Sequence, residues 1–497
     1  MEEQRSFLSA VKWAYSLYWG GKGISAVVFF LLAGLLGPKD FGTVAIATIY
    51  ITFLQLFLDQ GLATALIQRR NLEQEHLNAV FWVNLAFSLA LVLISFLFSR
   101  LWAAFNHAPE VSSVIRILSL SIVIEALSTV QAALLQREMN YRTLSIRTNL
   151  SVLVSGIVGI ALAFSGFGVW SLVSQQLLKD ILSLVLLWRL SSWRPSFRFS
   201  WRALKELLSF SVPHFFSQLA SFVDTQLASV VLGAFFGPIA VGLYKFVERA
   251  VATVVSMSSG SIHIVTFSMF SRLQDNLVNL QQSVLTSLRM SSAASLPALA
   301  GLAVTSDPLM AAIGASWVPA SDALKVLCVS GAAMILASFT SPLIQALGNP
   351  QHSAILEWGR VIAGIAALIA AALLVQNSPI QDQVLGIAMA RLFIAVLLVF
   401  PIFVHILLKL SSIPFRDFIT ATFPSILASI AVVLSVELFR HFAMTAESRP
   451  TIALAREIAV GGVAGLTTLA FADERARSFV SMVAKKTIRQ LSTKAPQ

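Results

Sequence analysis

The chain has 497 residues, of which 57% are hydrophobic and 12% are charged, and its formal net charge is +11 at pH 7. Soluble domains carry about 45–50% apolar and about 25% charged residues, so this chain has too little polar side chain to cover a soluble surface. The composition excludes a cytosolic enzyme, a nucleic-acid-binding protein and a secreted disulfide scaffold. It predicts an all-α, multi-pass membrane protein.

Apolar runs bounded by charged residues, Pro or Gly predict fourteen transmembrane helices, because a helix needs roughly 20 apolar residues to cross a bilayer. The runs are continuously apolar and do not alternate with polar residues, which excludes a transmembrane barrel. In chain order the predicted spans are Trp13–Leu36, Phe41–Ile67, Ala79–Phe98, Val114–Gln136, Thr148–Phe164, Val169–Trp188, Leu207–Phe236, Ile239–Ser268, Leu285–Thr305, Ala323–Leu347, Ile355–Val375, Val384–Leu408, Ile419–Phe439 and Ile452–Phe471.

The distribution of Lys and Arg predicts the orientation of these spans. With the N-terminus inside, 23 of the 35 basic residues fall on the cytoplasmic side and 8 on the opposite side. Cytoplasmic loops of membrane proteins are enriched in Lys and Arg. We therefore expect both termini to be cytoplasmic.

A long basic connection divides the predicted spans into two groups. Residues 191–206 contain Trp193, Phe197, Phe199 and Trp201 among basic residues, and such a segment is expected to lie along the inner leaflet with its rings at headgroup depth. The predicted organisation is a six-helix lobe in residues 1–190, this amphipathic cytoplasmic linker in 191–206, a second six-helix lobe in 207–410, two additional transmembrane helices in 411–472 and a basic cytoplasmic tail in 473–497.

A short turn motif is repeated at equivalent places in the two groups. Gly37-Pro38 follows the first span and is succeeded by Gly42, and Gly237-Pro238 follows the seventh span and is succeeded by Gly242. Pro ends a helix, and Gly permits a close approach of backbones. The repeat indicates duplication of a six-helix unit, with a pseudo-two-fold axis along the membrane normal. Transporters built from such repeats place substrate at the repeat interface.

The order and spacing of several motifs resemble polysaccharide-exporting flippases of the multidrug/oligosaccharidyl-lipid/polysaccharide (MOP) superfamily. The resemblance is to the Wzx-type subgroup that includes colanic-acid and succinoglycan exporters, and it covers the first 270 residues best. The motifs are Leu36-Gly37-Pro38 with Phe41-Gly42, Phe57-Leu58-Asp59-Gln60-Gly61-Leu62, Ala65-Leu66-Ile67-Gln68, Phe81-Trp82-Val83-Asn84, Gly166-Phe167-Gly168-Val169-Trp170-Ser171-Leu172-Val173, Asp224 with Leu232-Gly233, and Gly242-Leu243-Tyr244 with Arg249.

The resemblance implies a MOP flippase fold, with two six-helix lobes in a V, two C-terminal helices and a central cavity that opens alternately to either side. The implied cargo is an undecaprenyl-pyrophosphate-linked oligosaccharide, moved from the inner to the outer leaflet. Membrane lipids, a polysaccharide polymerase and chain-length machinery are the implied partners. Gly34 and Thr225 stand where such sequences often carry basic residues, so the outer end of this cavity is expected to be less cationic.

Basic residues inside the predicted spans are candidates for binding the pyrophosphate. A charge at a helix centre costs on the order of 2.5–3.5 kcal/mol on insertion scales, so those retained usually face a cavity or a partner. Lys22, Arg249 and Lys245 are the predicted substrate-binding cations. The alternative is that Lys245, Glu248 and Arg249 neutralise one another, because their spacing places them on one helix face.

Four acidic residues are candidates for coupling to a proton or sodium gradient, or for lining the cavity. They are Asp59, Glu125, Asp180 and Asp224. The alternative is that each is paired or hydrogen-bonded inside the bundle, and Lys179 beside Asp180 favours such local neutralisation for that residue.

Patterns of catalysis are missing from the sequence. The seven histidines show no metal-ligand spacing, and neither a Walker A loop nor a nucleophile elbow is present. We therefore predict a transporter that is not an enzyme, without cofactor, metal or nucleic-acid partner. The alternatives are an ion-coupled drug antiporter of the same superfamily, which normally has twelve spans, a lipid II flippase, and a membrane glycosyltransferase or polymerase.

Overall fold

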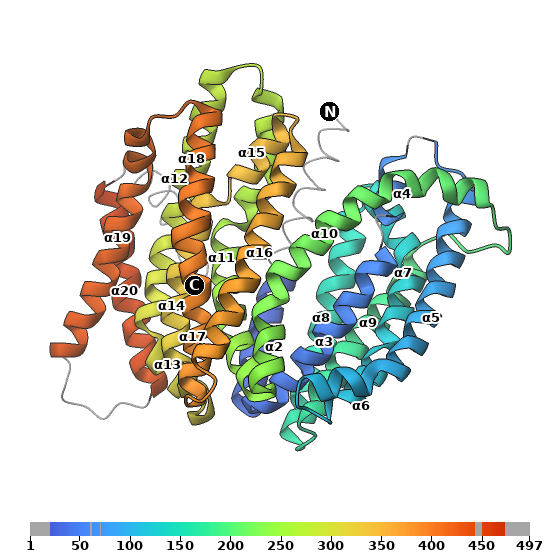
Figure 1. Ribbon diagram of the computed structural model, residues 1–497, viewed down its shortest axis with the longest axis horizontal. Helices are drawn as coiled ribbons and strands as arrows, with labels where there is room; N and C mark the ends of the chain where they lie inside the picture. Colours follow the sequence, from blue (N-terminus) through green and yellow to red (C-terminus); the bar gives the residue numbers. More distant parts are fainter. Residues whose placement is uncertain (1–19, 60–61, 70, 443–449, 473–497) are drawn as a thin grey trace, which may run out of the picture. The chain divides into compact units, whose positions relative to one another are not determined.

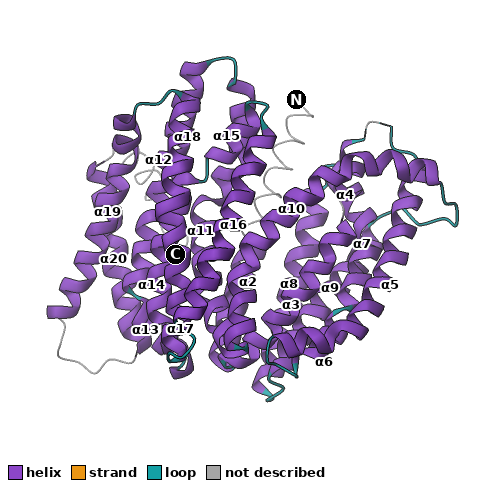
Figure 2. Cartoon of the chain, in the orientation of Figure 1, coloured by secondary structure: helices purple, strands orange, loops and turns teal. Residues whose placement is uncertain are grey.

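The computed structural model describes residues 20–59, 62–69, 71–442 and 450–472. Within these ranges the chain is helical and contains no strand (Figure 2). Among the described residues, eleven helices are long and apolar enough to cross a membrane, or twelve if the bent pair Leu277–Val304 and Ser306–Ile313 forms one span. The prediction of an all-α multi-pass membrane protein is confirmed, while the number fourteen stays a prediction.

Contacts divide the chain into two compact units, whose helices are labelled in Figure 1. Unit 1 comprises Met1–Phe246 with Leu368–Gln383, and unit 2 comprises Val247–Ala367 with Val384–Gln497. The helices of unit 1 are α2 (Gly21–Leu35), α3 (Pro38–Asp59), α4 (Leu62–Gln68), α5 (Gln74–Phe105), α6 (Val111–Leu118), α7 (Leu120–Arg137), α8 (Tyr141–Phe164), α9 (Val169–Leu190), α10 (Trp201–Phe236) and the first residues of α11 (Pro238–Leu273).

The ends of these helices follow from local sequence. Pro38 and Pro238 stand at the first positions of α3 and α11, where the missing N–H of Pro is not needed. Asn140 caps α8 by accepting a hydrogen bond from the N–H of Thr143 (3.2 Å), as N-cap side chains do. At the end of α4, Arg137 donates hydrogen bonds to the carbonyls of Leu66 (3.1 Å), Ile67 and Arg69. The last carbonyls of a helix have no partner within the helix, and a basic side chain can satisfy them.

The two Gly-Pro turns of the sequence repeat meet inside unit 1. A methyl group at Gly42 would overlap the carbonyl oxygen of Pro238, and a methyl group at Gly242 would overlap the carbonyl oxygen of Pro38. This reciprocity is what a local two-fold relation between the turns produces. We call the contact the glycine crossing, and it explains why both turns carry Gly four residues after Pro.

Helix α10 packs on the helices that precede it, because both of its ends are held there. Near its start, Glu206 accepts a hydrogen bond from Arg69 (2.5 Å). Near its end, Asn106 lies against Gly233, and the His107 ring donates to the carbonyl of Ala234 (3.1 Å). These contacts place α10 in unit 1. The predicted lobe boundaries at 190 and 410 stay predictions.

Unit 2 contains the rest of α11 and the helices that follow it, except for residues 368–383, which belong to unit 1. Phe270, Leu288, Phe339 and Leu407 form the buried centre of one apolar cluster. The helices are α12 (Leu277–Val304), α13 (Ser306–Ile313), the 3₁₀ turn η2 (Ala315–Ala320), α14 (Ser321–Ala337), α15 (Thr340–Ala346), α16 (Pro350–Leu374), α17 (Ile380–Phe393), the π segment η3 (Ile394–Val399), α18 (Phe400–Ser411), α19 (Phe415–Phe442) and α20 (Pro450–Ala472).

The last two helices are joined by a bidentate ion pair. Arg440 of α19 donates to both carboxylate oxygens of Glu457 of α20 (2.8 and 2.7 Å) and to the carbonyl of Val304 in α12 (2.6 Å). Glu457 is buried, and its planar partner satisfies both of its oxygens. The pair therefore fixes α20 to α19, while the predicted domain of two additional helices in 411–472 stays a prediction.

The predicted spans fall on helices wherever the structure describes them, with differences in continuity. The second span is divided between α3 and α4, the fourth between α6 and α7, and the tenth between α14 and α15. No helix was predicted in 306–320, where the structure has α13, bent by 64° from α12, and η2. The part of the first span before residue 20 lies outside the described residues.

Candidate functional site

Unit 1 contains a polar cavity of about 500 Å³ between α3, α4, α7, α8 and α9. Several pairs of these helices pack against each other, including α7 with α9 and α3 with α9. The volume is in the range of small-molecule sites. Its lining residues are Gln55, Leu58, Ala63, Ile67, Ser121, Ile124, Glu125, Ser128, Thr129, Ala132, Ala133, Gln136, Arg147, Gln176, Lys179, Asp180 and Ser183.

One face of α7 supplies much of the polar lining. Ser121, Glu125, Ser128 and Gln136 follow one another at intervals of four, three and eight residues. A helix has 3.6 residues per turn, so these intervals keep the four side chains on one side. In an otherwise apolar span, this polar stripe is the sequence signal that points to the cavity.

Four ionisable side chains line the cavity, two of each sign: Arg147, Lys179, Glu125 and Asp180. Lys179 Nζ lies 3.3 Å from Asp180 Oδ1, so the local pairing considered from the sequence is present. The structure therefore brings together two of the four predicted acids, Glu125 and Asp180. Asp59 and Asp224 are not among the lining residues.

Arg147 is a cavity residue that the sequence analysis missed. The predicted span began at Thr148, which placed Arg147 in a cytoplasmic loop, whereas α8 begins at Tyr141. Its Nη2 donates to Thr148 Oγ1 (3.4 Å). Its Nε atom is buried without a hydrogen-bond partner among the described residues.

A second lining atom is also left without a partner. Ser121 is 2% exposed, and its Oγ makes no hydrogen bond to any described residue. Buried polar atoms in proteins are nearly always hydrogen-bonded to protein, water or ligand. Arg147 Nε and Ser121 Oγ therefore indicate that the cavity is a wet site that accepts water or a polar ligand.

The predicted substrate-binding cations lie on α2 and α11. Lys22 is exposed on the first turn of α2, and Arg249 is exposed in the part of α11 that belongs to unit 2. Lys245 is half-buried and donates to Gln226 Oε1 of α10 (2.8 Å). Because Lys22 and Arg249 belong to different units, a joint site stays a prediction.

The two remaining predicted acids lie outside the polar cavity. Asp224 is half-buried in α10. Asp59 is the last residue of α3, and its side chain lies outside the described part of the structure.

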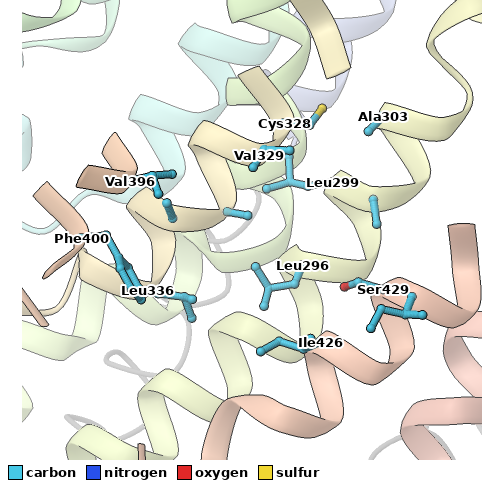
Figure 3. A pocket seen from close by; sticks show the side chains of 14 residues that line it. Leu296, Leu299, Ala303, Cys328, Val329, Leu336, Val396, Phe400, Ile426 and Ser429 are labelled. Atoms are coloured by element: carbon cyan, nitrogen blue, oxygen red, sulfur yellow. The ribbon is translucent and has the colours of Figure 1, made fainter. Parts of the chain in front are cut away.

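Unit 2 contains an apolar pocket of about 360 Å³. Figure 3 shows Leu299, Cys328, Leu336, Val396 and Ile426 among its lining side chains, which come from α12, α14, η3 and α19. None of the lining residues carries a charge, and Ser429 supplies the single hydroxyl. Among the residues that the structure describes, no group of three or more His, Cys, Asp or Glu is placed to hold a metal ion.

Comparison with known proteins gives consistent matches. The family model described as "Polysaccharide biosynthesis protein" matches residues 31–322. The succinoglycan biosynthesis transport protein ExoT of Rhizobium meliloti is 29% identical over 357 residues, which are 72% of this chain and 72% of that protein. The teichuronic acid biosynthesis protein TuaB of Bacillus subtilis is 26% identical over 72% of each chain. The lipopolysaccharide biosynthesis protein WzxC of Escherichia coli is 23% identical over 73% of this chain and 72% of its own.

Solved structures of two transporter types share the fold. The lipid II flippase MurJ in an inward closed conformation matches 93% of this chain and 98% of its own, with a TM-score of 0.73 and 15% identity. An inward-facing multidrug resistance transporter of the MATE family, of the MOP superfamily, matches 79% of this chain and 96% of its own, with a TM-score of 0.61 and 17% identity. The fold predicted from the resemblance to the MOP superfamily is thereby confirmed.

Proposed function

This chain belongs to the polysaccharide biosynthesis protein family, and from that premise we propose that it is a flippase for lipid-linked oligosaccharides. It moves an undecaprenyl-pyrophosphate-linked repeat unit from the inner to the outer leaflet of the bacterial cytoplasmic membrane by alternating access. The name of the Rhizobium relative describes a transport protein of polysaccharide synthesis, and that of the structural neighbour describes a lipid flippase. Both names support a transporter and neither supports an enzyme.

The polar cavity of unit 1 is the observation that carries this proposal beyond family membership. A sugar phosphate does not dissolve in hydrocarbon, so a protein that transfers it must offer polar surroundings within the membrane. The cavity offers Arg147, Lys179 and three glutamines in helices that are otherwise apolar. Each such group makes insertion less favourable, and the unpartnered Arg147 Nε and Ser121 Oγ among the described residues favour a polar ligand over helix packing as the reason for their presence.

The acids of the cavity are proposed to couple transport to an ion gradient. Glu125 and Asp180 share the cavity with two cations, and a bound proton or sodium ion changes the charge balance among the four groups. Such a change favours one state of the transporter over another when the ion binds the two states differently. Asp59 and Asp224 are proposed as further coupling acids on the evidence of the sequence.

Lys22, Lys245 and Arg249 are proposed to hold the pyrophosphate. Arg presents a planar set of donors that matches phosphate oxygens, and Lys supplies a compact positive charge. Lys22 and Arg249 are exposed, so both are accessible to a ligand. We further propose cytoplasmic termini, and a polysaccharide polymerase and chain-length machinery as partners that receive the cargo.

The proposal is tested in a deletion strain of the source bacterium. We expect lipid-linked oligosaccharide to accumulate on the inner leaflet, with its sugars identified by mass spectrometry, and export to return with the wild-type gene. Accumulation of lipid II would favour a lipid II flippase, and altered drug resistance alone would favour an antiporter. Sugar transfer by the purified chain from a nucleotide-sugar or lipid-linked donor would assign it to the enzymes.

A further inference from the structure

The linker, residues 191–206, is fixed on the surface of unit 1. Its first ten residues, 191–200, are not helical, and residues 201–206 begin α10. Ser196 accepts a hydrogen bond from Asn78 Nδ2 at its hydroxyl (2.7 Å) and donates its N–H to Asn78 Oδ1 (2.9 Å). Trp82 Nε1 donates to the carbonyl of Ser196 (2.8 Å). These hydrogen bonds determine which side of the linker faces α5.

Fixing this side turns three aromatic rings outward. Phe197 is 93% exposed and Trp201 is 75% exposed, and Phe199 is also exposed. Phe197 stacks on Trp82 with ring centroids 5.1 Å apart, and Phe199 meets Trp201 edge to face at the same distance. By contrast Trp193 is buried, and its Nε1 donates to Gln74 Oε1 (3.2 Å). Phe197, stacked on Trp82, and the Phe199–Trp201 pair thus leave aromatic surface exposed on the linker.

Basic side chains alternate with these rings. Arg198, Arg202 and Lys205 are exposed, and the Arg202 side chain is 92% exposed. Arg194 differs from them, because it donates to the carbonyls of Trp188 (2.6 Å), Ser191 (2.7 Å) and Trp193 (2.7 Å) and is thereby used within the fold.

The single acid of the linker, Glu206, offsets only part of this positive charge. Glu206 accepts hydrogen bonds from Arg69 (2.5 Å) and Arg202 (3.2 Å). Arg198 and Lys205 therefore face solvent together with the highly exposed Arg202 and the rings.

We propose that this face of the linker, made of Phe197, Phe199, Trp201, Arg198, Arg202 and Lys205, binds the headgroups of anionic phospholipids. Aromatic rings with a polar neighbour settle at the headgroup level of a bilayer, and Lys and Arg beside them attract anionic lipid. Acyl chains alone would not require the cations, and a soluble partner would not require rings that are next to a membrane-spanning bundle. The inference is independent of the cargo that the protein carries.

Binding of phosphatidylglycerol to the purified full-length chain tests this assignment, with phosphatidylcholine as the neutral comparison and native mass spectrometry as the readout. Each basic side chain near a membrane surface contributes about fivefold to the affinity for anionic lipid. We expect the wild type to prefer phosphatidylglycerol, and Arg198→Gln/Arg202→Gln to lose more than tenfold of that preference. The matched control Arg272→Gln/Lys409→Gln removes the same charge from exposed positions outside the linker and should retain the preference.

Equal binding of the two lipids by the wild type, or equal losses in the linker variant and the control, would overturn the proposal. A second measurement uses no arginine substitution and so does not depend on the folding of that variant. Brominated phosphatidylglycerol should quench the fluorescence of the wild type more than that of Trp201→Phe. Identical quenching of the two would place Trp201 away from the lipid and contradict the assignment.

Discussion

The glycine crossing and the polar cavity are both parts of unit 1, and they differ in packing density and in polarity. At the crossing, backbone meets backbone at Gly42 and Gly242, with no room for one methyl group. In the cavity, five helices leave about 500 Å³ of space lined by charged and polar side chains. Close packing stabilises a fold, whereas buried charges with unsatisfied atoms reduce its stability. The crossing therefore serves the fold, whereas the cavity reduces its stability and is the site that we propose for transport.

The apolar pocket of unit 2 is a cavity without buried charges in its lining. Its lining is aliphatic apart from Phe400, Cys328 and Ser429, so it adds nothing to the cost of inserting the helices into a membrane. An apolar hollow in a membrane protein needs no functional explanation, but a polar one does. Substitutions in the two parts of unit 1 should therefore separate stability from transport.

The largest effect is expected at the glycine crossing. Gly42→Ala or Gly242→Ala forces a methyl group onto a carbonyl oxygen that belongs to the backbone and cannot rotate away. Overpacking costs about 1–3 kcal/mol and occasionally more, so we expect a lower unfolding temperature and little folded protein in the membrane. Gly37→Ala is the matched control, because nothing lies within 4 Å of its added methyl group. Equal stability of the Gly42 and Gly37 variants would contradict the crossing.

Arg147→Ala should reduce transport and leave stability largely unchanged, the opposite of what is expected at the glycine crossing. It removes a cation with a buried, unpartnered Nε from the cavity, so the fold should tolerate it. Hydrogen bonds to charged groups are worth about 1.5–3 kcal/mol, and we expect export to fall by on the order of tenfold to a hundredfold. Export and unfolding temperature are measured on the same preparations. Wild-type export with a lowered unfolding temperature would make Arg147 a structural residue.

Glu125→Gln and Asp180→Asn should have a smaller effect on rate and a distinct effect on pH dependence. Both keep the shape of the side chain and remove its ability to bind a proton. If these acids couple transport to an ion gradient, each variant should lose about tenfold in export, and the remaining export should no longer vary with the gradient. Phe400→Leu in the apolar pocket is the control. Gradient-dependent export in both acid variants would exclude these two acids from coupling.

The smallest effect is expected at Glu206, outside both regions. Hydrogen bonds from Arg69, then from Arg202 and His76, hold the pKa of Glu206 below its ordinary value of 4.5. A carboxylate with a lowered pKa stabilises the fold above its ordinary pKa, and this contribution is lost as the pH falls through the lowered value. The unfolding temperature of the wild type should therefore fall more than that of Glu206→Gln between pH 6 and pH 3. Parallel falls would show that the pair does not stabilise the fold.

The helices and the repeated Gly-Pro turns were largely predictable from the sequence, because each depends on local signals. Apolar runs gave the spans, and Pro38 and Pro238 with the glycines after them gave the repeated turns. The contact between the two turns could not be predicted from the repeat, because it depends on how the helices pack. The bend between α12 and α13 was missed although Pro308 marks it, because Pro308 cannot donate to the carbonyl of Val304. The eight residues of Ser306–Ile313 are too few to show a helical period.

The cavity was only partly predictable. Glu125 and Asp180 stood out as charges in apolar spans, but nothing in the sequence says that α7 and α9 place them in one space. Arg147 was missed because the apolar run of α8 starts after it, although the helix begins at Tyr141. A cavity lined by five helices depends on how they pack together, and the periodicity of a single helix does not predict that packing.

Transfer of a fluorescent lipid-linked oligosaccharide across the bilayer of proteoliposomes tests the central claim most directly. We expect the purified chain to move the lipid-linked sugar between leaflets, Gly37→Ala to do so at the wild-type rate, and Arg147→Ala to do so at least about tenfold more slowly. Absence of transfer by the wild type under an imposed ion gradient, or equal rates in the wild type and Arg147→Ala, would contradict a flippase that works through this cavity.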